Sequence, residues 1–290
     1  MAMSKRDSKT KGEQQWSRRE IDLGARGQMR ISHARGPEGA PALVLLHGLA
    51  ATGQLNWFTA MPALAERFQV LVVDHRGHGG GIRTHHFRLA DCADDVIAVA
   101  DELGIETLTA VGYSMGGPIA KLTWSRHRDR VAGLVLCATA RHFIRPEVRG
   151  LASAVMPGAV LATRIAPRLF LDRFIDGMVD SQKRPEAAQF VRDEMAGTDP
   201  STLMQAVRAL IRFSSHDWLA DINVPTAVVV TTRDELVPPS RQYKLAEAIP
   251  NAKVFEVDGD HFACARAVEQ FVPALVEACE YVTSVGLKNA

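Results

Sequence analysis

The sequence predicts an α/β protein with a mostly parallel central sheet and helices on both of its faces. Short apolar segments alternate along the chain with longer segments of helical periodicity, which is the pattern of a parallel sheet with crossover helices. The short segments are apolar throughout, as strands buried on both faces are. The 290 residues, 47% hydrophobic and 23% charged, suit one large domain or a core with an inserted subdomain.

Five segments rich in Leu, Val and Ala are predicted to form the central strands. They are residues 42–46, 70–73, 108–111, 134–137 and 227–230. Two weaker candidates, residues 20–23 and 28–32, come first and are predicted to start the sheet in antiparallel fashion. A last strand is predicted in the segment AKVFEVD, residues 252–258.

Helices are predicted between these strands from apolar residues spaced three and four apart. One repeats over residues 89–100, a second continues from the turn at residue 114 through Ile119 and Leu122, and a third covers residues 267–282 near the end of the chain.

The alternation stops between residues 141 and 216, where the pattern is helical and interrupted by prolines. An insertion between two parallel strands lies at their carboxyl ends, where open α/β folds bind ligands. We therefore expect a helical cap at 141–216 over a core made of 20–140 and 217–290. Residues 1–19 are polar and basic, and we expect a disordered tail.

Composition narrows the classes of partner. The formal net charge of +1 gives no reason to expect nucleic acid, and the longest apolar stretch is too short for an integral membrane segment. No secretory signal or transit peptide is evident, and the four scattered cysteines fit a cytoplasmic protein with reduced thiols.

The segment AVGYSMGGPIA places one serine, Ser114, between Gly112 and Gly116. A strand precedes it and a helix follows it, so the serine lies at a sharp strand-to-helix turn. Such a turn strains the serine backbone and is tolerated only when the flanking residues have little or no side chain. We interpret Ser114 as a nucleophile, with Gly112 and Gly116 making the turn possible.

A serine hydroxyl needs a base, and the base needs a carboxylate that fixes its tautomer. His261, in VDGDHFACA, follows the last predicted strand and is our candidate base. Asp234 ends a buried strand in VVVTTRDELVPP and is our candidate acid, with Glu235 as its alternative. Asp260 is disfavoured, because a residue adjacent to His261 seldom directs its carboxylate at that ring.

Acyl transfer also needs hydrogen-bond donors for the oxyanion. The main-chain N–H of Met115 follows the nucleophile at a helix N-terminus, where the helix dipole favours an anion. The second donor is expected to be the N–H of Leu49 in LLHGLAATG, with His47 bracing that loop through hydrogen bonds.

Together the segments HGLAATG, VVDHRGHGGG, GYSMGG, TTRDELVPP and DGDHFA resemble the α/β-hydrolase superfamily, in particular its capped serine esterases and lipase-like hydrolases. The resemblance covers residues 20–290 and implies the α/β-hydrolase fold, with the triad in the order Ser114, Asp234, His261. It also implies that the DHRGHG segment is a structural turn. Epoxide hydrolases and haloalkane dehalogenases of this fold carry aspartate at the position of Ser114, so those activities are disfavoured.

The resulting hypothesis is a carboxylic-ester hydrolase that acts on a small-to-medium hydrophobic ester. C–C bond hydrolase, thioesterase, perhydrolase and acyltransferase activities use the same triad and stay open, as does a ligand-binding receptor with a slow triad. No cofactor or metal is expected, and the adjacent His85 and His86 are poorly placed to share an ion. The sequence leaves the oligomeric state undetermined.

Overall fold

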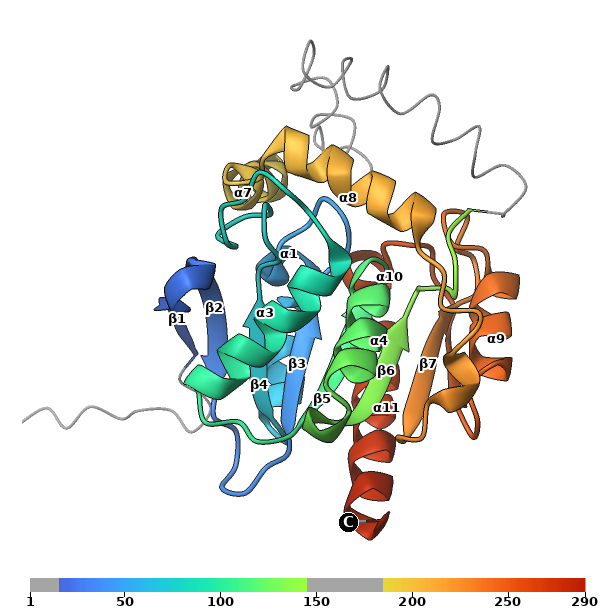
Figure 1. Ribbon diagram of the computed structural model, residues 1–290. Coiled ribbons are helices and arrows are strands. Elements are labelled where there is room, and N and C mark those ends of the chain that lie inside the picture. Colours follow the sequence, from blue (N-terminus) through green and yellow to red (C-terminus); the bar gives the residue numbers. More distant parts are fainter. Residues whose placement is uncertain (1–15, 145–184, 290) are drawn as a thin grey trace, which may run out of the picture.

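The computed structural model describes residues 16–144 and 185–289, and these residues form one eight-stranded sheet between two layers of helices (Figure 1). The strand order is β1-β2-β4-β3-β5-β6-β7-β8. The strands are β1 (Ser17–Asp22), β2 (Gln28–Ala34), β3 (Ala42–Leu46), β4 (Gln69–Val73), β5 (Leu108–Tyr113), β6 (Val131–Cys137), β7 (Thr226–Thr231) and β8 (Lys253–Val257).

The helices of the described part of the chain fall into three groups. One face of the sheet is covered by α3 (Leu89–Glu102), α4 (Gly116–Arg126) and α9 (Pro239–Glu247). The opposite face is covered by α1 (Gly53–Trp57), α2 (Met61–Ala65), α10 (Ala263–Arg266) and α11 (Val268–Asn289). Two more, α7 (Pro185–Met195) and α8 (Pro200–Arg212), lie across the top of the sheet (Figure 1).

Strands β3 to β8 pair in parallel, while β1 and β2 join the edge in antiparallel fashion. The predicted fold class and its antiparallel start are therefore confirmed. The expected boundary of the tail at residue 19 is wrong, because β1 already begins at Ser17, which pairs with His33 of β2. Ladder hydrogen bonds of this kind are tertiary contacts that the polar, basic composition of the segment does not reveal.

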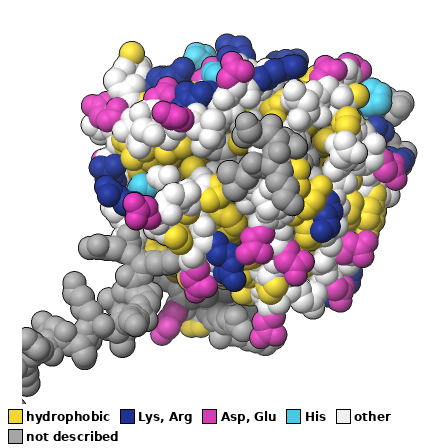
Figure 2. All heavy atoms as spheres, turned by 90° about the horizontal axis from the view of Figure 1, so that it is seen from below, with side chains coloured by type: hydrophobic (Ala, Val, Ile, Leu, Met, Phe, Trp, Pro, Cys, Tyr) yellow, Lys and Arg dark blue, Asp and Glu magenta, His cyan; other side chains and the backbone are white. Residues whose placement is uncertain are grey.

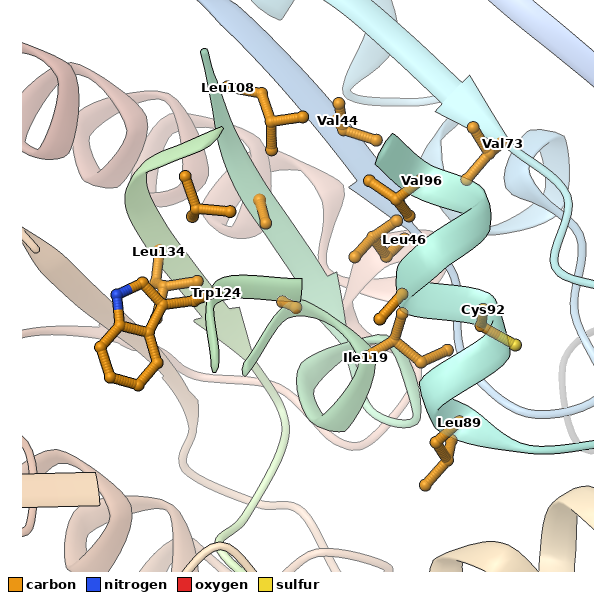
Figure 3. Packing of buried hydrophobic residues seen from close by; sticks show 14 of the residues in the cluster. Val44, Leu46, Val73, Leu89, Cys92, Val96, Leu108, Ile119, Trp124 and Leu134 are labelled. Atoms are coloured by element: carbon orange, nitrogen blue, oxygen red, sulfur yellow. The ribbon is translucent and has the colours of Figure 1, made fainter. Parts of the chain in front are cut away.

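The central strands are buried on both faces, as their apolar sequences predict. From one face of β3, Val44 and Leu46 pack against α3 and α4, where Val96 and Ile119 meet them (Figure 3). Leu43 and Leu45 of the same strand belong to the second core, on the other face of the sheet. This alternation fixes the sheet between its two helical layers, and its carboxyl edge then faces α7 and α8.

Helix α7 is tied to two distant parts of the core through one carboxylate. Glu194 accepts two hydrogen bonds from the Arg18 guanidinium of β1, both at 2.8 Å, and a third from Thr52 at 3.3 Å. Thr52 in turn caps α1 by accepting from Leu55 N–H. Residues 145–184 of the cap expected at 141–216 lie outside the described residues.

The surface carries charges of both signs. Seen from below, acidic and basic side chains are interspersed with small hydrophobic areas (Figure 2). Among the described residues, no helix is both long enough and apolar enough to cross a membrane.

One buried cation lies where the chain leaves the sheet after β6 and returns after α8. The Lys121 ammonium, fully buried on α4, donates to Ala140 O at 2.9 Å and to Ser215 Oγ at 3.1 Å. Its nitrogen also lies 5.0 Å from the centre of the Phe213 ring. Because these partners are neutral and burial disfavours the charge, the pKa of Lys121 is lowered to about 7.

We predict that Lys121→Met stabilises the protein, and that the gain disappears at high pH. An unfolded lysine binds its proton up to a pKa near 10.4, whereas the folded one loses it near pH 7. The free energy of unfolding of the wild type therefore rises between these pH values, and the full cost of the charge is present below pH 7. The variant should gain about 1 kcal/mol or more at pH 6.5.

Urea unfolding at pH 6.5, 8.5 and 9.5 measures this difference. Lys244→Met, on the exposed side of α9, is the matched control and should show no such pH dependence. A Lys121→Met protein that is less stable than the wild type at pH 6.5 contradicts the prediction.

Candidate active site

Ser114 lies at the turn between β5 and α4, in the conformation that the motif predicts. Its φ angle is +51°, in the left-handed region that non-glycine residues rarely adopt. The turn is held on both sides of the serine: Ser114 N–H donates to Cys137 O at 2.9 Å, and Thr139 Oγ1 donates to Ser114 O at 2.8 Å. The strained serine is thus fixed by the end of the neighbouring strand β6.

The two flanking glycines are required by contact between backbones. A Cβ atom at Gly112 would lie 2.2 Å from Gly116 O, and one at Gly116 would lie 2.1 Å from Leu46 O. Both distances are far below van der Waals contact, and each involves a main-chain atom that cannot rotate away. Any side chain at either position would push α4 off the sheet and displace Ser114.

Ser114, His261 and Asp234 form a continuous hydrogen-bonded chain. His261 Nε2 lies 3.0 Å from Ser114 Oγ, and His261 Nδ1 lies 2.7 Å from Asp234 Oδ2. Since an ionised carboxylate only accepts hydrogen bonds, Nδ1 carries the hydrogen in the neutral ring and Nε2 is left to accept from the serine. The arrangement can remove a proton from the hydroxyl.

The Asp234 carboxylate is fully buried and saturated with donors. Its Oδ1 accepts from the N–H groups of Leu236 at 3.0 Å and Val237 at 2.8 Å. Its Oδ2 accepts from Thr231 Oγ1 at 2.9 Å and Gln242 Nε2 at 3.3 Å, besides His261. These bonds fix the position of the carboxylate that orients the imidazole.

The alternatives to Asp234 are occupied elsewhere. Glu235 is exposed, and the Asp260 carboxylate accepts from Phe262 N–H at 2.8 Å and from the Arg266 guanidinium at 2.8 Å. Within the described part of the chain, Asp234 is the one of these three carboxylates that is hydrogen-bonded to His261.

The loop after β3 lies directly beside Ser114. Both main-chain polar groups of Gly48 in this loop are hydrogen-bonded to side chains. Gly48 N–H donates to Asn56 Oδ1 at 2.9 Å, while Gly48 O accepts from His47 Nδ1 at 2.7 Å. In a trans peptide the C=O and the following N–H point in opposite directions. The bond from His47 therefore turns the next N–H, that of Leu49, away from His47.

Three imidazole rings, those of His47, His75 and His78, lie close together with their planes tilted. The ring centroids of His47 and His75 are 4.2 Å apart, and those of His47 and His78 are 5.3 Å apart. Burial lowers the pKa of His47 to about 4 and that of His78 to about 3, and it lowers the pKa of His75 well below its usual value. The rings are neutral at pH 7, and His47 Nε2 accepts from His75 N–H at 2.9 Å.

A pocket of about 260 Å³ opens beside the serine. Ser114 and His261 contribute polar side chains to its lining, Leu49 contributes an apolar one, and the remaining lining is predominantly apolar. The other lining residues are Gly48, Ala50, Ala51, Asn56, Tyr113, Phe143, Leu210, Leu236, Val237, Phe262 and Cys264. Such a cavity can hold an uncharged group attached to a reacting carbonyl.

The described residues hold no cluster of three or more His, Cys, Asp or Glu side chains able to bind a metal ion. His85 and His86 are both exposed, at the loop that contacts α8. The four cysteines are free and buried.

Sequence reasoning missed Asn56, Tyr113 and Gln242. Asn56 holds the loop after β3, Gln242 holds Asp234, and the Tyr113 hydroxyl donates to His261 O at 2.9 Å. The only available signal was the position of Tyr113 directly before the serine. The partners of the other two side chains are only eight residues away in sequence, but each contact depends on how the intervening segment folds back.

Known proteins resemble the chain over most of its length. A model of the alpha/beta hydrolase fold family matches residues 41–266. The pimeloyl-[acyl-carrier protein] methyl ester esterase of Chromobacterium violaceum is 30% identical over 245 residues, which cover 83% of this chain and 94% of that protein.

Two further relatives carry other names. A protein of Caulobacter sp. strain K31, named as a candidate carbamate hydrolase, is 30% identical over 227 residues, covering 74% of this chain and 82% of its own length. The solved enol-lactonase of Burkholderia xenovorans LB400 superposes with a TM-score of 0.72 at 25% identity, covering 87% of this chain and 96% of that one. Taken with the sheet order and the turn at Ser114, these similarities show that the chain belongs to the alpha/beta hydrolase fold family.

Proposed function

We propose that the chain is a serine hydrolase that cleaves small-to-medium hydrophobic carboxylic esters through an acyl-enzyme on Ser114. The observation that carries this proposal is the hydrogen-bonded chain from Ser114 through His261 to Asp234 at the mouth of an apolar pocket. The esterase and lactonase names of the relatives agree with ester chemistry.

In the first step, Ser114 Oγ attacks the ester carbonyl while His261 Nε2 takes the hydroxyl proton. The imidazolium that forms is stabilised by Asp234, whose carboxylate lies 2.7 Å from Nδ1. The tetrahedral intermediate then collapses, the bond to the alcohol oxygen breaks, and His261 returns the proton to the departing alcohol.

Negative charge on the carbonyl oxygen would be held by the main-chain N–H groups of Leu49 and Met115. Met115 stands at the start of α4, where the helix dipole also favours an anion. The bond from His47 to Gly48 O supports the first donor, because it fixes the peptide to which the Leu49 N–H belongs.

In the second step, water attacks the acyl-enzyme with His261 as the base. The proton passes from water to Nε2 and then to Ser114 Oγ as the acid is released. Apart from the attacking water, all groups that act in both steps belong to the protein, so the proposed reaction requires no cofactor.

The pocket supports a hydrophobic substrate. Phe143 and Leu210 come from the two ends of the cap that we propose for residues 141–216, and Leu236 stands at the rim with 65% of its surface exposed. We further propose that the protein works in the cytoplasm, since its buried thiols are unpaired.

We predict that Ser114→Ala abolishes ester hydrolysis. Without the nucleophile no acyl-enzyme can form, so turnover of p-nitrophenyl butyrate should fall by at least about a thousandfold. Labelling by a fluorophosphonate, which reacts covalently with an activated serine, should be lost as well. Fluorophosphonate labelling that persists in the variant, or a wild type limited to a single turnover, would refute the proposal.

We predict that Asp234→Asn lowers kcat by about ten thousandfold, because an amide cannot hold His261 in the required tautomer or stabilise the imidazolium. Glu235→Gln removes the neighbouring, exposed carboxylate and is the matched control, expected to keep kcat within about twofold. Steady-state kinetics on the same ester measures both variants. If Glu235→Gln is the damaging change, the assignment of Asp234 is wrong.

A further inference from the structure

Tyr113 ends strand β5, immediately before the proposed nucleophile. Its side chain points to the face of the sheet that is covered by α1, α10 and α11, opposite to the face covered by α4. There its ring lies edge-on to Trp57, with centroids 6.0 Å apart, and to Phe271, with centroids 5.6 Å apart. With 3% of its surface exposed, the ring is locked in place.

From this position the Tyr113 hydroxyl reaches the loop that carries His261. It donates to the main-chain carbonyl oxygen of His261 at 2.9 Å, and the two rings lie edge to face with centroids 5.9 Å apart. Tyr113, the residue before Ser114, thus binds the backbone of His261, the proposed base, although the two residues are 148 positions apart in the chain.

The turn that bears His261 is otherwise held at points around the histidine. Asp260 Oδ1 accepts from Phe262 N–H at 2.8 Å, within the turn, and Thr59 Oγ1 donates to Cys264 O at 2.7 Å, three residues later. The bond from Tyr113 differs from these two, since it acts on His261 itself and starts from the strand that positions Ser114.

We propose that Tyr113 is a positioning residue that sets the separation between His261 Nε2 and Ser114 Oγ through the hydrogen bond of its hydroxyl to His261 O. This inference rests on the proposed serine-hydrolase function. The tyrosine touches neither the scissile bond nor the transferred proton; it acts through the backbone of the base.

The consequence of losing the hydroxyl follows from the geometry. His261 is held at its ring by Asp234 and at its backbone by Tyr113, and proton transfer works over the 3.0 Å between Nε2 and Ser114 Oγ. Without the hydroxyl, the partly buried carbonyl of His261 loses a donor and the turn can shift. Small displacements of a catalytic group reduce the rate of the chemical step much more than the binding of substrate.

The test compares Tyr113→Phe with the wild type in steady-state hydrolysis of p-nitrophenyl butyrate. The phenylalanine keeps the ring and removes only the hydroxyl. We expect kcat to fall about tenfold while KM stays within about twofold. Tyr243→Phe is the matched control: it removes a hydroxyl that binds Glu256 at the surface, 2.5 Å away, and should leave both constants unchanged.

A double-mutant cycle separates positioning of the base from a merely structural role. Removing one triad member leaves residual catalysis that does not use the base. In a His261→Ala background, Tyr113→Phe should therefore cause no further loss of this residual rate. A role in folding the serine turn would instead lower the residual rate by the same factor in both backgrounds.

Three results would overturn the inference while the proposed function stands: an unchanged kcat in Tyr113→Phe, a loss confined to KM, or an equal loss in the His261→Ala background. Failure of the proposed function looks different. In that case the wild type neither turns over the ester nor reacts with a fluorophosphonate, and the role of Tyr113 is refuted with it.

Discussion

The site depends on a contact between bare backbones at the turn after β5. Helix α4 approaches the sheet so closely that two glycines leave no room for a Cβ atom. A Cβ atom at Gly112 would collide with Gly116 O, and one at Gly116 would collide with Leu46 O. This contact allows Ser114 to adopt its left-handed conformation, which costs of order 1–3 kcal/mol. The cost is met by packing on either side, since β5 and α4 are both buried against the core around Ile119 and Val44. Ser114 therefore keeps a backbone conformation that is rare for serine because the surrounding fold holds it in place.

The parallel sheet then determines what can reach the serine. Ser114, Asp234 and His261 follow the ends of β5, β7 and β8, which all point in the same direction. Each of the three lies on a short loop anchored by other groups: Thr139 for the serine, Gln242 and two main-chain N–H groups for the aspartate, and Tyr113 for the histidine. Strand order thus brings the three loops to one edge of the sheet, and hydrogen bonds between the loops fix their side chains.

Much of this arrangement could be predicted from short segments of sequence. The glycines around Ser114 impose a backbone shape that few alternatives satisfy, and the apolar strands have one stable place, between two helical layers. What escaped prediction depends on how strands pair and how loops fold back. Sequence alone assigns residues 17–19 to the polar tail, because their composition does not indicate a strand. They form one by pairing with Ile31, Ser32 and His33 of β2, a contact that the local sequence does not encode. The supporting bonds of Asn56 and Tyr113 likewise depend on loop paths that periodicity does not encode.

The Glu194 carboxylate of α7 links the edge strand β1 to the loop after β3. Its carboxylate joins Arg18, on a strand at the outer edge of the sheet, to Thr52, in the loop that also contains Leu49. The first strand, remote from the serine, is therefore linked through one carboxylate to the loop that lines the pocket, and loss of the Arg18 guanidinium would remove the two hydrogen bonds that it donates to Glu194.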